Sequence, residues 1–310
     1  MNMTTHRVTV VIPAYEEAEI ISKIVREVLD LHPDFEVLVV DDGSQDRTAE
    51  EARLAGARVI QHPYNMGNGA AVKTGIRHAS GQIVVLMDGD GQHAANEIDK
   101  LLRFMENHDM VVGARTKGSS RSFHRYGANL VYNLLASYIT KFRVQDLTSG
   151  FRAIRASVAR RYLHLLPNTF SYPSTLTLSF LRSGRSIRFV PIVTRERKGK
   201  SKIRLFSDGA RFFLIIVRIA LLYAPLRIFL PVSLTQFLAG FGWYLYTYLT
   251  QHRFTNMSLL FFLSGLTIFM LGLVSEQIAL LRMAGTEESV REETIDEVTE
   301  RATEGAFSEK

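Results

Sequence analysis

The sequence predicts an α/β protein in which a mostly parallel sheet domain is followed by an interfacial helix and two transmembrane helices. In the first part of the chain, short apolar runs alternate with segments of helical periodicity. This alternation is typical of a parallel sheet whose two faces are covered by helices. Later in the chain, two uncharged stretches at 228–251 and 254–275 are each long enough to span the hydrocarbon core of a bilayer.

Five apolar runs predict strands of the sheet. They lie at 7–12, 35–40, 57–61, 83–87 and 110–114. After the first run, Ile20, Ile24 and Val28 recur at helical spacing, which places them on one face of a helix. Since strands and helices alternate, the polar residues that follow the strands are expected to meet at one edge of the sheet, where a nucleotide site would lie.

Two further helices have predicted ends. Thr48 and Glu51 form a capping-box pattern, and Gly56 predicts the end of that helix. The glycine-rich segment 65–69 opens another helix that runs to about Ala79. The amino end of this helix is expected to receive a phosphate group, because the first amides of a helix have no partner within the helix.

The stretch 83–93, which reads IVVLMDGDGQH, organises the rest of the chain. Asp88 and Asp90 stand two residues apart just past the apolar run, and Gln92 follows them. Oxygen ligands of this kind suit hard divalent cations such as Mg²⁺ or Mn²⁺. Asp-Gly pairs are also common turn residues, so an ordinary turn is the alternative that this stretch alone leaves open.

Charge is distributed unevenly along the chain. The 310 residues include no cysteine, which excludes disulfides and thiolate metal sites, and the net charge is +6. Between residues 115 and 227 there are 22 Lys or Arg and only 3 acidic residues. Basic residues are densest at 195–204, where six of ten are Lys or Arg. Such a cluster predicts an anionic partner, and nucleic acid is the most common partner of basic clusters.

The two uncharged stretches argue for a membrane instead of nucleic acid. They contain 24 and 22 residues, and only His252 and Arg253 separate them. Because the preceding segment is rich in Arg and Lys, the positive-inside rule predicts that the sheet domain and both termini are cytosolic in a multi-pass protein of the cell membrane. The basic cluster would then attract anionic lipid headgroups. A buried pair of core helices is the alternative.

The predicted domains are a sheet domain at 1–205, an amphipathic interfacial segment at 206–227, transmembrane helices at 228–251 and 254–281, and an acidic tail at 282–310. The interfacial segment has Arg211 and Arg218 seven residues apart with apolar residues between them. From Glu287 onward, nine acids and three bases predict a solvated helix or a disordered tail.

Five motifs in order carry a family resemblance. They read VIPAYEE, DDGSQDRT, NMGNGAAVKTG, DGDGQH and DLTSGFR. In this order they resemble the family 2 glycosyltransferases of GT-A fold, over about residues 7 to 205. The likeness is strongest to the polyprenyl-phosphate glycosyltransferases, the group that includes dolichyl-phosphate mannose synthase and bacterial undecaprenyl-phosphate glucosyltransferases. One departure is Gly89, where an alanine is commoner in the family; we expect it to loosen the loop without removing a ligand.

The resemblance implies an inverting, metal-dependent enzyme that moves a hexose from a UDP- or GDP-linked sugar to undecaprenyl or dolichyl phosphate, as in cell-envelope glycan assembly or protein glycosylation. The nucleotide-sugar residues it implies are Pro13, Ala14, Tyr15, Glu17, Asp41, Asp42, Lys73 and Asp88. The Mg²⁺ or Mn²⁺ ligands are Asp88, Asp90 and Gln92, and Asp90 also belongs to the catalytic group. A solvated helix residue is the alternative for Lys73, and a helix-start or supporting residue is the alternative to a ligand for His93.

The acceptor phosphate is expected to meet basic and hydroxyl groups. The candidates are Arg115, Arg125, Ser149, Arg197 and Lys202. Arg115 and Arg125 flank a polar loop that could close over the site, and guanidinium groups match phosphate oxygens. Solvated side chains are the alternative for Arg121 and Arg125.

Asp146 is the catalytic base by resemblance. A lipid phosphate with a pKa of about 6 is largely ionised at neutral pH, so orientation of the acceptor is the alternative role for this carboxylate.

Two other functions remain open at the level of sequence. A processive polysaccharide synthase usually carries a QxxRW motif and more spans, whereas Trp243 here lies inside a predicted span. A non-catalytic nucleotide-sugar-binding membrane scaffold would be expected to lose a motif aspartate, and all are present. The expected partners are the nucleotide sugar, the polyprenyl phosphate and membrane lipids, without nucleic acid, and a homo-oligomer is compatible with the sequence.

Overall fold

The structure is a computed structural model, and it describes residues 7–115, 133–134, 136–138, 140–168, 171–195, 217, 221 and 224–281. The chain divides into two compact units, Met1–Phe213 and Leu214–Lys310. Most of the predicted interfacial segment at 206–227 and the whole acidic tail at 282–310 lie outside the described residues. The bounds of the five predicted domains therefore remain predictions.

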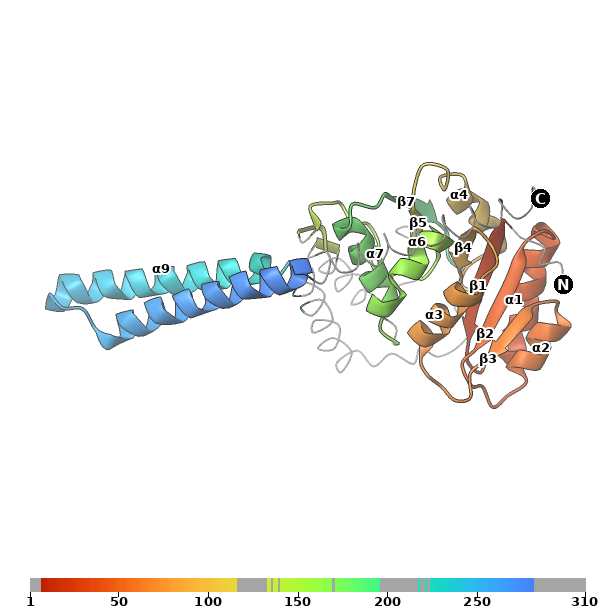
Figure 1. The fold of residues 1–310 in the computed structure, drawn as a ribbon, viewed down its shortest axis with the longest axis horizontal. Coiled ribbons are helices and arrows are strands. Elements are labelled where there is room, and N and C mark those ends of the chain that lie inside the picture. Colours follow the sequence, from red (N-terminus) through yellow and green to blue (C-terminus); the bar gives the residue numbers. More distant parts are fainter. Residues whose placement is uncertain are drawn as a thin grey trace, which may run out of the picture. The chain divides into compact units, whose positions relative to one another are not determined.

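A seven-stranded mixed sheet forms the centre of the first unit, with strand order β3-β2-β1-β4-β6-β5-β7 (Figure 1). The strands are β1 (Val8–Ala14), β2 (Glu36–Asp41), β3 (Arg58–Gln61), β4 (Ile83–Leu86), β5 (Met110–Arg115), β6 (Arg152–Arg155) and β7 (Ile187–Ile192). All pairings are parallel except those of β6, which runs antiparallel to both β4 and β5. The prediction of a mostly parallel sheet is confirmed.

The two strands that the apolar runs did not predict are β6 and β7. β6 has the sequence RAIR, whose central apolar pair is flanked by arginine on both sides, and β7 contains a proline at position 191. Neither segment presents a continuous apolar run. These segments become strands because they pair with β4 and β5 in the folded protein. Without them, backbone N–H and C=O groups of β4 and β5 would have no hydrogen-bond partner.

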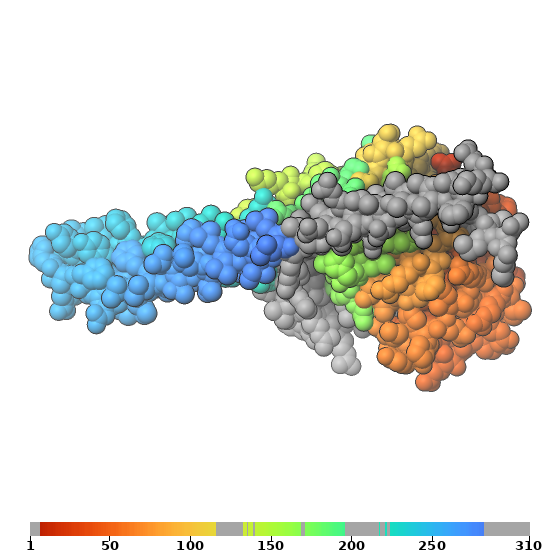
Figure 2. Space-filling model, in the orientation of Figure 1, coloured from red at the N-terminus to blue at the C-terminus, as the bar shows by residue number. Residues whose placement is uncertain are grey.

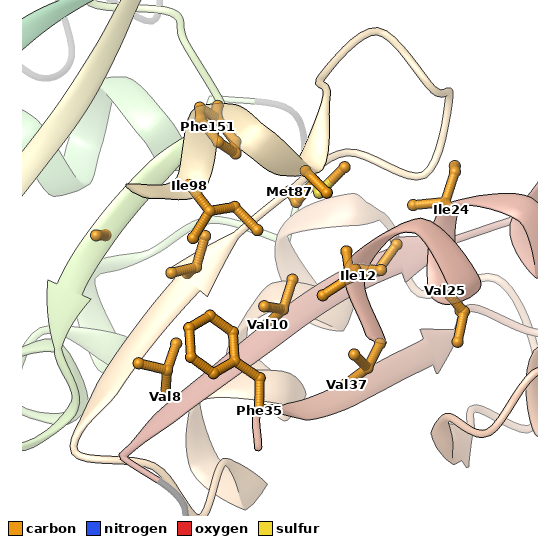
Figure 3. Close-up of a cluster of buried hydrophobic side chains, with 14 of the residues drawn as sticks. Val8, Val10, Ile12, Ile24, Val25, Phe35, Val37, Met87, Ile98 and Phe151 are labelled. Carbon is orange, nitrogen blue, oxygen red and sulfur yellow. The ribbon is translucent and has the colours of Figure 1, made fainter. Parts of the chain in front are cut away.

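Helices cover both faces of the sheet. They are α1 (Ala18–Leu31), α2 (Thr48–Leu54), α3 (Asn68–His78), α4 (Ile98–Leu102), α6 (Ala156–Arg161) and α7 (Tyr172–Arg182), with single 3-10 turns at Ala95–Glu97 and Leu163–Leu165. Val8, Val10 and Ile12 of β1 share one buried cluster with Ile24 and Val25 of α1 (Figure 3). The alternate residue Val11 meets α3, since a Cβ at Gly75 would lie 2.2 Å from its Cγ1. Successive side chains of a strand point to opposite faces, so α1 and α3 lie on opposite sides.

The buried face of α1 differs slightly from the prediction. Ile24 and Val28 are buried as predicted, together with Ile21 and Val25, while Ile20 is only partly buried. Ile20 nevertheless packs against Gly91: its Cδ1 lies 2.5 Å from the position that a Cβ on Gly91 would occupy. Gly91 has a φ of +72°, a conformation that favours glycine. The helix thus packs against the loop that follows β4.

The start of α2 differs from the predicted capping box. The helix begins at Thr48 itself, and the Thr48 amide donates to Asp46 Oδ1 at 3.0 Å. The Thr48 hydroxyl oxygen accepts the Glu17 amide at 2.9 Å, so it serves the loop after β1 and not the helix. The predicted end is confirmed: Gly56 follows the helix with a φ of +101°.

The second unit contains two long helices, α9 (Leu226–Gln251) and Asn256–Leu281, which lie side by side (Figures 1 and 2). Glycine on one helix meets phenylalanine on the other, since a Cβ at Gly240, Gly265 or Gly272 would lie 2.9, 3.1 or 2.6 Å from Phe261, Phe237 or Phe229. Small residues of this kind allow close packing of membrane helices. Both helices are long and apolar enough to cross a membrane, and only 11% and 17% of their most apolar windows are buried. They therefore do not resemble the core helices of a soluble protein.

Candidate active site

The predicted donor-side residues gather where β1, β2 and β4 end. Ala14, the last residue of β1, is level with Asp41, the last residue of β2. On the other side of β1, Val11 is level with Leu86, two residues before Asp88. These are adjacent parallel strands, so their carboxyl ends form one edge, which is the place where open α/β sheets bind ligands.

The loop between β1 and α1 is held by the second motif. The amides of Glu16, Glu17 and Ala18 donate to Ser44 Oγ at 2.9 Å, Thr48 Oγ1 at 2.9 Å and Asp46 Oδ2 at 3.2 Å, respectively. Glu16 has a φ of +55°, which is uncommon for a residue other than glycine and is often found at functional sites. Two of the predicted motifs, PAYEE and DDGSQDRT, therefore form a single structure.

Asp41 and Asp42 are buried and already bonded to the protein. The carboxylate of Asp41 accepts the Ser44 amide at 3.1 Å and Gln61 Nε2 at 3.2 Å. Asp42 Oδ1 accepts the Met66 amide at 2.9 Å, and its Oδ2 accepts the Gly67 amide at 2.8 Å. Each aspartate thus organises the loops at this edge, in addition to the nucleoside contact that the resemblance implies.

The amino end of α3 is bonded to a segment that lies far away in the sequence. The amides of Gly69 and Ala70 donate to the Asn168 carbonyl at 2.9 and 3.3 Å. Lys73 donates to the Leu166 carbonyl at 3.2 Å and forms a short bond with Asn168 Oδ1. Burial, with a smaller effect of Arg77, lowers the pKa of Lys73. Asn168 thus meets both the helix end and Lys73, and the predicted role of this helix end and of Lys73 in donor binding stays a prediction.

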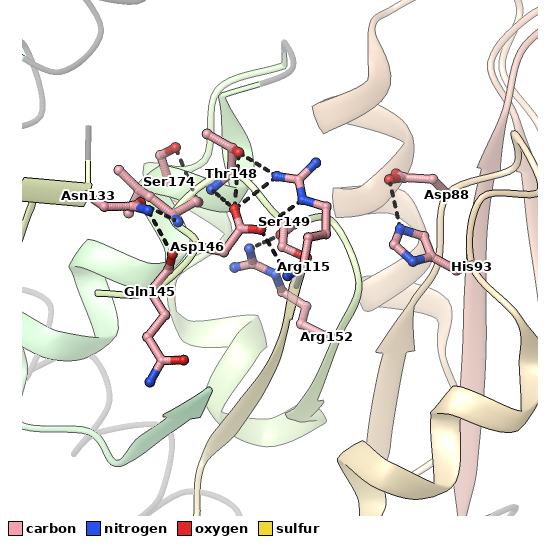
Figure 4. A network of polar contacts seen from close by, with 11 residues as sticks. Asp88, His93, Arg115, Asn133, Gln145, Asp146, Thr148, Ser149, Arg152 and Ser174 are labelled. Carbon is pink, nitrogen blue, oxygen red and sulfur yellow. Dashed lines mark hydrogen bonds and ion pairs between the residues drawn. The ribbon is translucent and has the colours of Figure 1, made fainter. Parts of the chain in front are cut away.

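Asp88 lies against the last of the five motifs. A Cβ at Gly150 would stand 2.7 Å from Asp88 Oδ2, so only glycine permits this approach. His93 Nε2 lies 3.7 Å from the same oxygen, and the His93 ring stacks on Phe151 at 4.7 Å (Figure 4). Burial alone would raise the pKa of Asp88, but His93, Arg115 and Arg152 outweigh it and lower the pKa. Asp88 is therefore ionised at neutral pH, and His93 is a supporting residue.

The loop after Asp88 is closely fitted to the sheet. A Cβ at Gly89 would stand 2.9 Å from the Pro13 carbonyl oxygen. Gly89 therefore allows the loop to lie against the end of β1, which is a different effect from the loosening expected from the sequence. Asp90 Oδ1 accepts the Gln92 amide at 3.1 Å and closes the turn.

The residues after β4 fit a hard divalent cation. Two carboxylates and one amide oxygen, at Asp88, Asp90 and Gln92, are the donor types that Mg²⁺ and Mn²⁺ prefer. No group of three or more His, Asp or Glu side chains gathers around one point within the described ranges. Mg²⁺ commonly takes one or two carboxylates and completes its shell with water and substrate phosphates, and the ligands Asp88, Asp90 and Gln92 stay a prediction.

Asp146 forms a two-pronged ion pair with Arg115 (Figure 4). Arg115 Nε lies 2.7 Å from Asp146 Oδ2, and Arg115 Nη2 lies 2.9 Å from Oδ1. Arg115 Nη2 also donates to Thr148 Oγ1 at 2.7 Å. Burial alone would lower the pKa of Arg115, but the hydrogen bonds and charge of Asp146 raise it. The structure thus joins the predicted base to one of the predicted acceptor ligands.

The sequence analysis did not single out Arg152, although it belongs to the DLTSGFR motif. Its side chain is fully buried and donates to the Pro173 carbonyl at 3.0 Å, to Thr177 Oγ1 at 3.2 Å and to the Ser149 carbonyl. Burial lowers the pKa of Arg152 to about 10, so it remains charged at neutral pH. Arg152 holds the motif against α7 and adds positive potential beside Asp88 and Asp146.

Ser149 and Arg195 complete the part of the acceptor side that is described. The Ser149 hydroxyl is buried and finds no hydrogen-bond partner among the described residues, which leaves it available to an acceptor oxygen. Arg195, the first residue of the basic cluster, pairs with Glu27 at 2.8 and 2.9 Å, and its amide donates to the Gln92 carbonyl at 2.8 Å. The start of the basic cluster therefore lies beside the loop of the predicted metal ligands. Arg125, Arg197 and Lys202 lie outside the described residues.

Two family models match this chain. Residues 9–163, half of the chain, match the family model named Glycosyl transferase family 2. The chain belongs to glycosyltransferase family 2. Residues 224–281 of this glycosyltransferase match a second family model, the GtrB C-terminal hairpin, which coincides with the two long helices.

Several curated relatives of this glycosyltransferase are lipid-phosphate sugar transferases by name. A dolichyl-phosphate hexose transferase of Haloferax volcanii is 34% identical over 219 residues, covering 68% of this chain and 93% of the relative. A polyprenol monophosphomannose synthase of Mycolicibacterium smegmatis is 32% identical over 216 residues, covering 64% of this chain and 82% of the relative.

Solved structures share the fold. Glucosyl-3-phosphoglycerate synthase from Mycobacterium tuberculosis, solved with Mn²⁺, UDP and phosphoglyceric acid, has a TM-score of 0.56 at 22% identity and covers 69% of this chain and 78% of that chain. At this identity the likeness establishes a fold of GT-A type. The predicted fold class and family are confirmed.

Proposed function

We propose that this glycosyltransferase moves a hexose from a nucleotide sugar to a polyprenyl phosphate at the membrane surface. The observation that carries the proposal is the contact between Asp88 and Gly150, which joins the predicted donor-diphosphate side to the motif that contains Asp146. A candidate membrane hairpin in the same chain supports a lipid acceptor. So do the names of the relatives in Haloferax and Mycolicibacterium.

In the proposed reaction, an oxygen of the acceptor phosphate attacks the anomeric carbon of the sugar, and the bond from that carbon to the nucleoside diphosphate breaks. Attack from the face opposite the leaving group gives inversion, as the family resemblance implies. Asp88, Asp90 and Gln92 would hold Mg²⁺ or Mn²⁺, which supplies positive charge to the departing diphosphate. Solved structures of similar fold contain Mn²⁺ or Mg²⁺, which supports this part of the proposal.

Arg115 has a double role in this proposal. The acceptor arrives with an anionic phosphate, and a guanidinium group binds phosphate and carboxylate with the same two-pronged geometry. The incoming phosphate therefore competes with Asp146 for Arg115 or shares it. The buried hydroxyl of Ser149 supplies a further donor. Arg125, Arg197 and Lys202 are proposed to complete the phosphate site.

Asp146 is proposed to orient the acceptor phosphate through Arg115 rather than to remove a proton. Its carboxylate is held by a charged guanidinium, which favours the ionised form, and an acceptor with a pKa of about 6 needs no base at neutral pH. Pro13, Ala14, Tyr15, Glu17, Asp41 and Asp42 are proposed to surround the nucleoside. We further propose that the first unit and both termini are cytosolic, because the positively charged residues precede the hairpin.

The test is direct transfer by the full-length protein in neutral detergent. The assay would combine a short-chain polyprenyl phosphate, Mn²⁺ and a panel of UDP- and GDP-linked hexoses, and would detect the lipid-phosphate sugar by mass spectrometry. One donor is expected to give a single-sugar product with the wild-type enzyme. Formation of a growing polysaccharide, or donor binding without any transfer, would overturn the proposal in favour of a polymer synthase or a binding protein.

A further inference from the structure

His62 lies directly after β3 and bridges two elements of the donor side. Its Nδ1 lies 2.7 Å from Asp42 Oδ1, and its Nε2 lies 2.9 Å from Thr74 Oγ1 on α3. The side chains of His62 and Asp42 are only 7% and 4% exposed. A buried hydrogen bond to a carboxylate is among the stronger polar contacts in a protein, so this bridge restrains both partners.

Asp42 passes this restraint to the loop before α3. Its carboxylate accepts the amides of Met66 and Gly67, and its own amide donates to the Ala14 carbonyl at 2.9 Å. Asp42 therefore links the end of β1, through its backbone amide, to the entry of α3, through its side chain. His62 adds the end of β3 and the body of α3 to the same network.

An independent observation points to the same tight fit. A Cβ at Gly43 would stand 2.4 Å from the Tyr64 carbonyl carbon and 2.8 Å from the Asn65 amide nitrogen. Gly43 also has a φ of +75°, which favours glycine. The turn after Asp42 and the backbone at Tyr64 and Asn65 are thus packed directly against each other.

We propose that His62 is a positioning residue for donor binding. It holds Asp42 and the segment Tyr64–Gly67 in the conformation that receives the nucleoside. An ionised carboxylate offers about four acceptor positions, and the three bonds to His62, Met66 and Gly67 use three of them. One remains for a hydroxyl or an N–H group of the nucleoside. The proposal rests on the proposed function, because it assigns the nucleoside to this edge of the sheet.

Hydrogen exchange tests the structural half of the proposal without any substrate. His62→Leu, His62→Asn and Thr74→Val would be compared with His78→Leu. The control carries the same change on the exposed side of α3, where His78 Nδ1 contacts the Thr74 carbonyl at 2.9 Å. His62→Leu is expected to speed exchange of the Met66 and Gly67 amides by about tenfold, and His62→Asn by less, since Asn retains a donor near Nδ1. Equal exchange in His62→Leu and His78→Leu would overturn the link.

Steady-state kinetics test the functional half. His62→Leu is expected to raise the donor KM about tenfold, while kcat and the acceptor KM change by less than about threefold. His62→Asn should recover most of the donor KM, and Thr74→Val should show a small increase. If His62→Leu does not fold, His62→Asn and Thr74→Val still give the comparison.

The outcomes separate this proposal from the proposed function. Faster exchange with an unchanged donor KM would overturn the positioning role and leave the transfer reaction standing. If His62→Leu instead lowers kcat equally for all acceptors, and His62→Asn does not restore kcat, His62 has a general packing role. That result would also overturn the positioning role. If the wild-type enzyme transfers no sugar to lipid phosphate, nucleoside diphosphate affinity measured by calorimetry replaces KM, and an equal affinity in His62→Leu would count against the proposal.

Discussion

At the scale of single residues, the contacts of Asp146 change the role that we infer for it. In the sequence it is one of three acids in a long basic region, and the family resemblance implies that it is the catalytic base. In the fold, both of its oxygens bind the Arg115 guanidinium, and Thr148 belongs to the same group. These contacts are the basis for the proposal that Asp146 orients the acceptor phosphate through Arg115.

Replacing Asp146 by Asn tests this interpretation. We expect kcat to fall about a hundredfold or more, because Arg115 loses its partner and the acceptor its orientation, while the donor KM changes little. The measurement is kcat between pH 6 and pH 9 for both enzymes. An orienting role predicts a loss of constant size. A loss that shrinks as pH rises would instead support proton removal, and an unchanged kcat would exclude both roles.

Gly150 is a second position at which the addition of a single carbon atom is expected to change activity. A Cβ there would lie 2.7 Å from Asp88 Oδ2, so Gly150→Ala must displace the carboxylate or the motif. We expect activity to fall about tenfold and the Mn²⁺ concentration for half-maximal activity to rise, since a misplaced ligand weakens metal binding. The measurement is a Mn²⁺ titration of transfer. Gly242→Ala is the matched control, because nothing lies within 4 Å of its added Cβ. Equal titrations for both variants would contradict the role of Asp88 as a metal ligand.

At the scale of elements, β2 and its neighbours are stabilised at the end opposite to the candidate site. Glu36, the first residue of β2, is 9% exposed and accepts hydrogen bonds from the Thr9 hydroxyl at 2.5 Å, the Ser80 amide at 2.9 Å and Arg58 Nη1 at 2.9 Å. These bonds join β1, β2, β3 and the segment before β4. The network secures the strand order that brings the motif residues together at the other end.

Replacing Glu36 by Gln should reveal this network through stability. Burial alone would raise the pKa of Glu36, but hydrogen bonds from Thr9, Ser80 and Arg58 outweigh this effect and lower the pKa. The ionised form therefore adds stability at neutral pH, and that contribution is lost as pH falls through the lowered pKa. We expect Tm at pH 7 to drop by about 5 °C, and we expect this difference from the wild type to narrow as pH falls through the lowered pKa of Glu36.

The measurement is thermal unfolding of the detergent-solubilised protein at several pH values. Glu50→Gln is the control, since Glu50 pairs with Arg47 at 2.9 Å on an exposed surface and such pairs contribute little. A Tm change that is the same for the two variants, or that grows as pH falls, would contradict the assignment.

At the scale of the whole molecule, a soluble-type catalytic unit and an apolar helical hairpin occur in one chain. The exposed apolar surface of the hairpin is far larger than isolated surface residues would produce, as Leu234, Leu238 and Leu249 show with 55%, 61% and 68% exposure. A transfer from a water-soluble donor to a lipid phosphate, as proposed, would use both properties. The basic segment at 195–204 precedes the hairpin in the sequence, and we propose that it binds the acceptor phosphate.

Replacing Arg197 and Lys202 together by Gln tests the role of that segment. We expect the acceptor KM to rise about tenfold in neutral detergent with a short-chain acceptor, because direct contacts with phosphate are charge-assisted bonds. Donor KM should be nearly unchanged. Lys23 and Arg103 replaced together by Gln is the control, since both are exposed and neither belongs to the five motifs. A defect seen only with anionic vesicles, and abolished by salt, would indicate membrane attachment at about 1 kcal/mol per charge instead of phosphate recognition.

Several properties of this protein follow from its sequence alone. The apolar runs identify five strands, and the order of five motifs identifies the family, because strand-end residues carry the chemistry and the strand interiors carry the apolar pattern. The uncharged stretches likewise predict the two long helices, since length and absence of charge are local properties.

Only the tertiary structure decides which of these residues touch. β6 is antiparallel and carries Arg152 into the core, a position that four residues reading RAIR do not predict. Three hydrogen-bonded pairs show this: Lys73 with Asn168, Arg115 with Asp146, and His62 with Asp42. The two residues of each pair are at least 20 positions apart in the chain. Periodicity and propensity report on neighbours within one element, whereas these contacts arise where separate elements end at one edge of the sheet. The sequence therefore predicts which residues take part in the candidate site, and the fold determines which other residues each of them contacts.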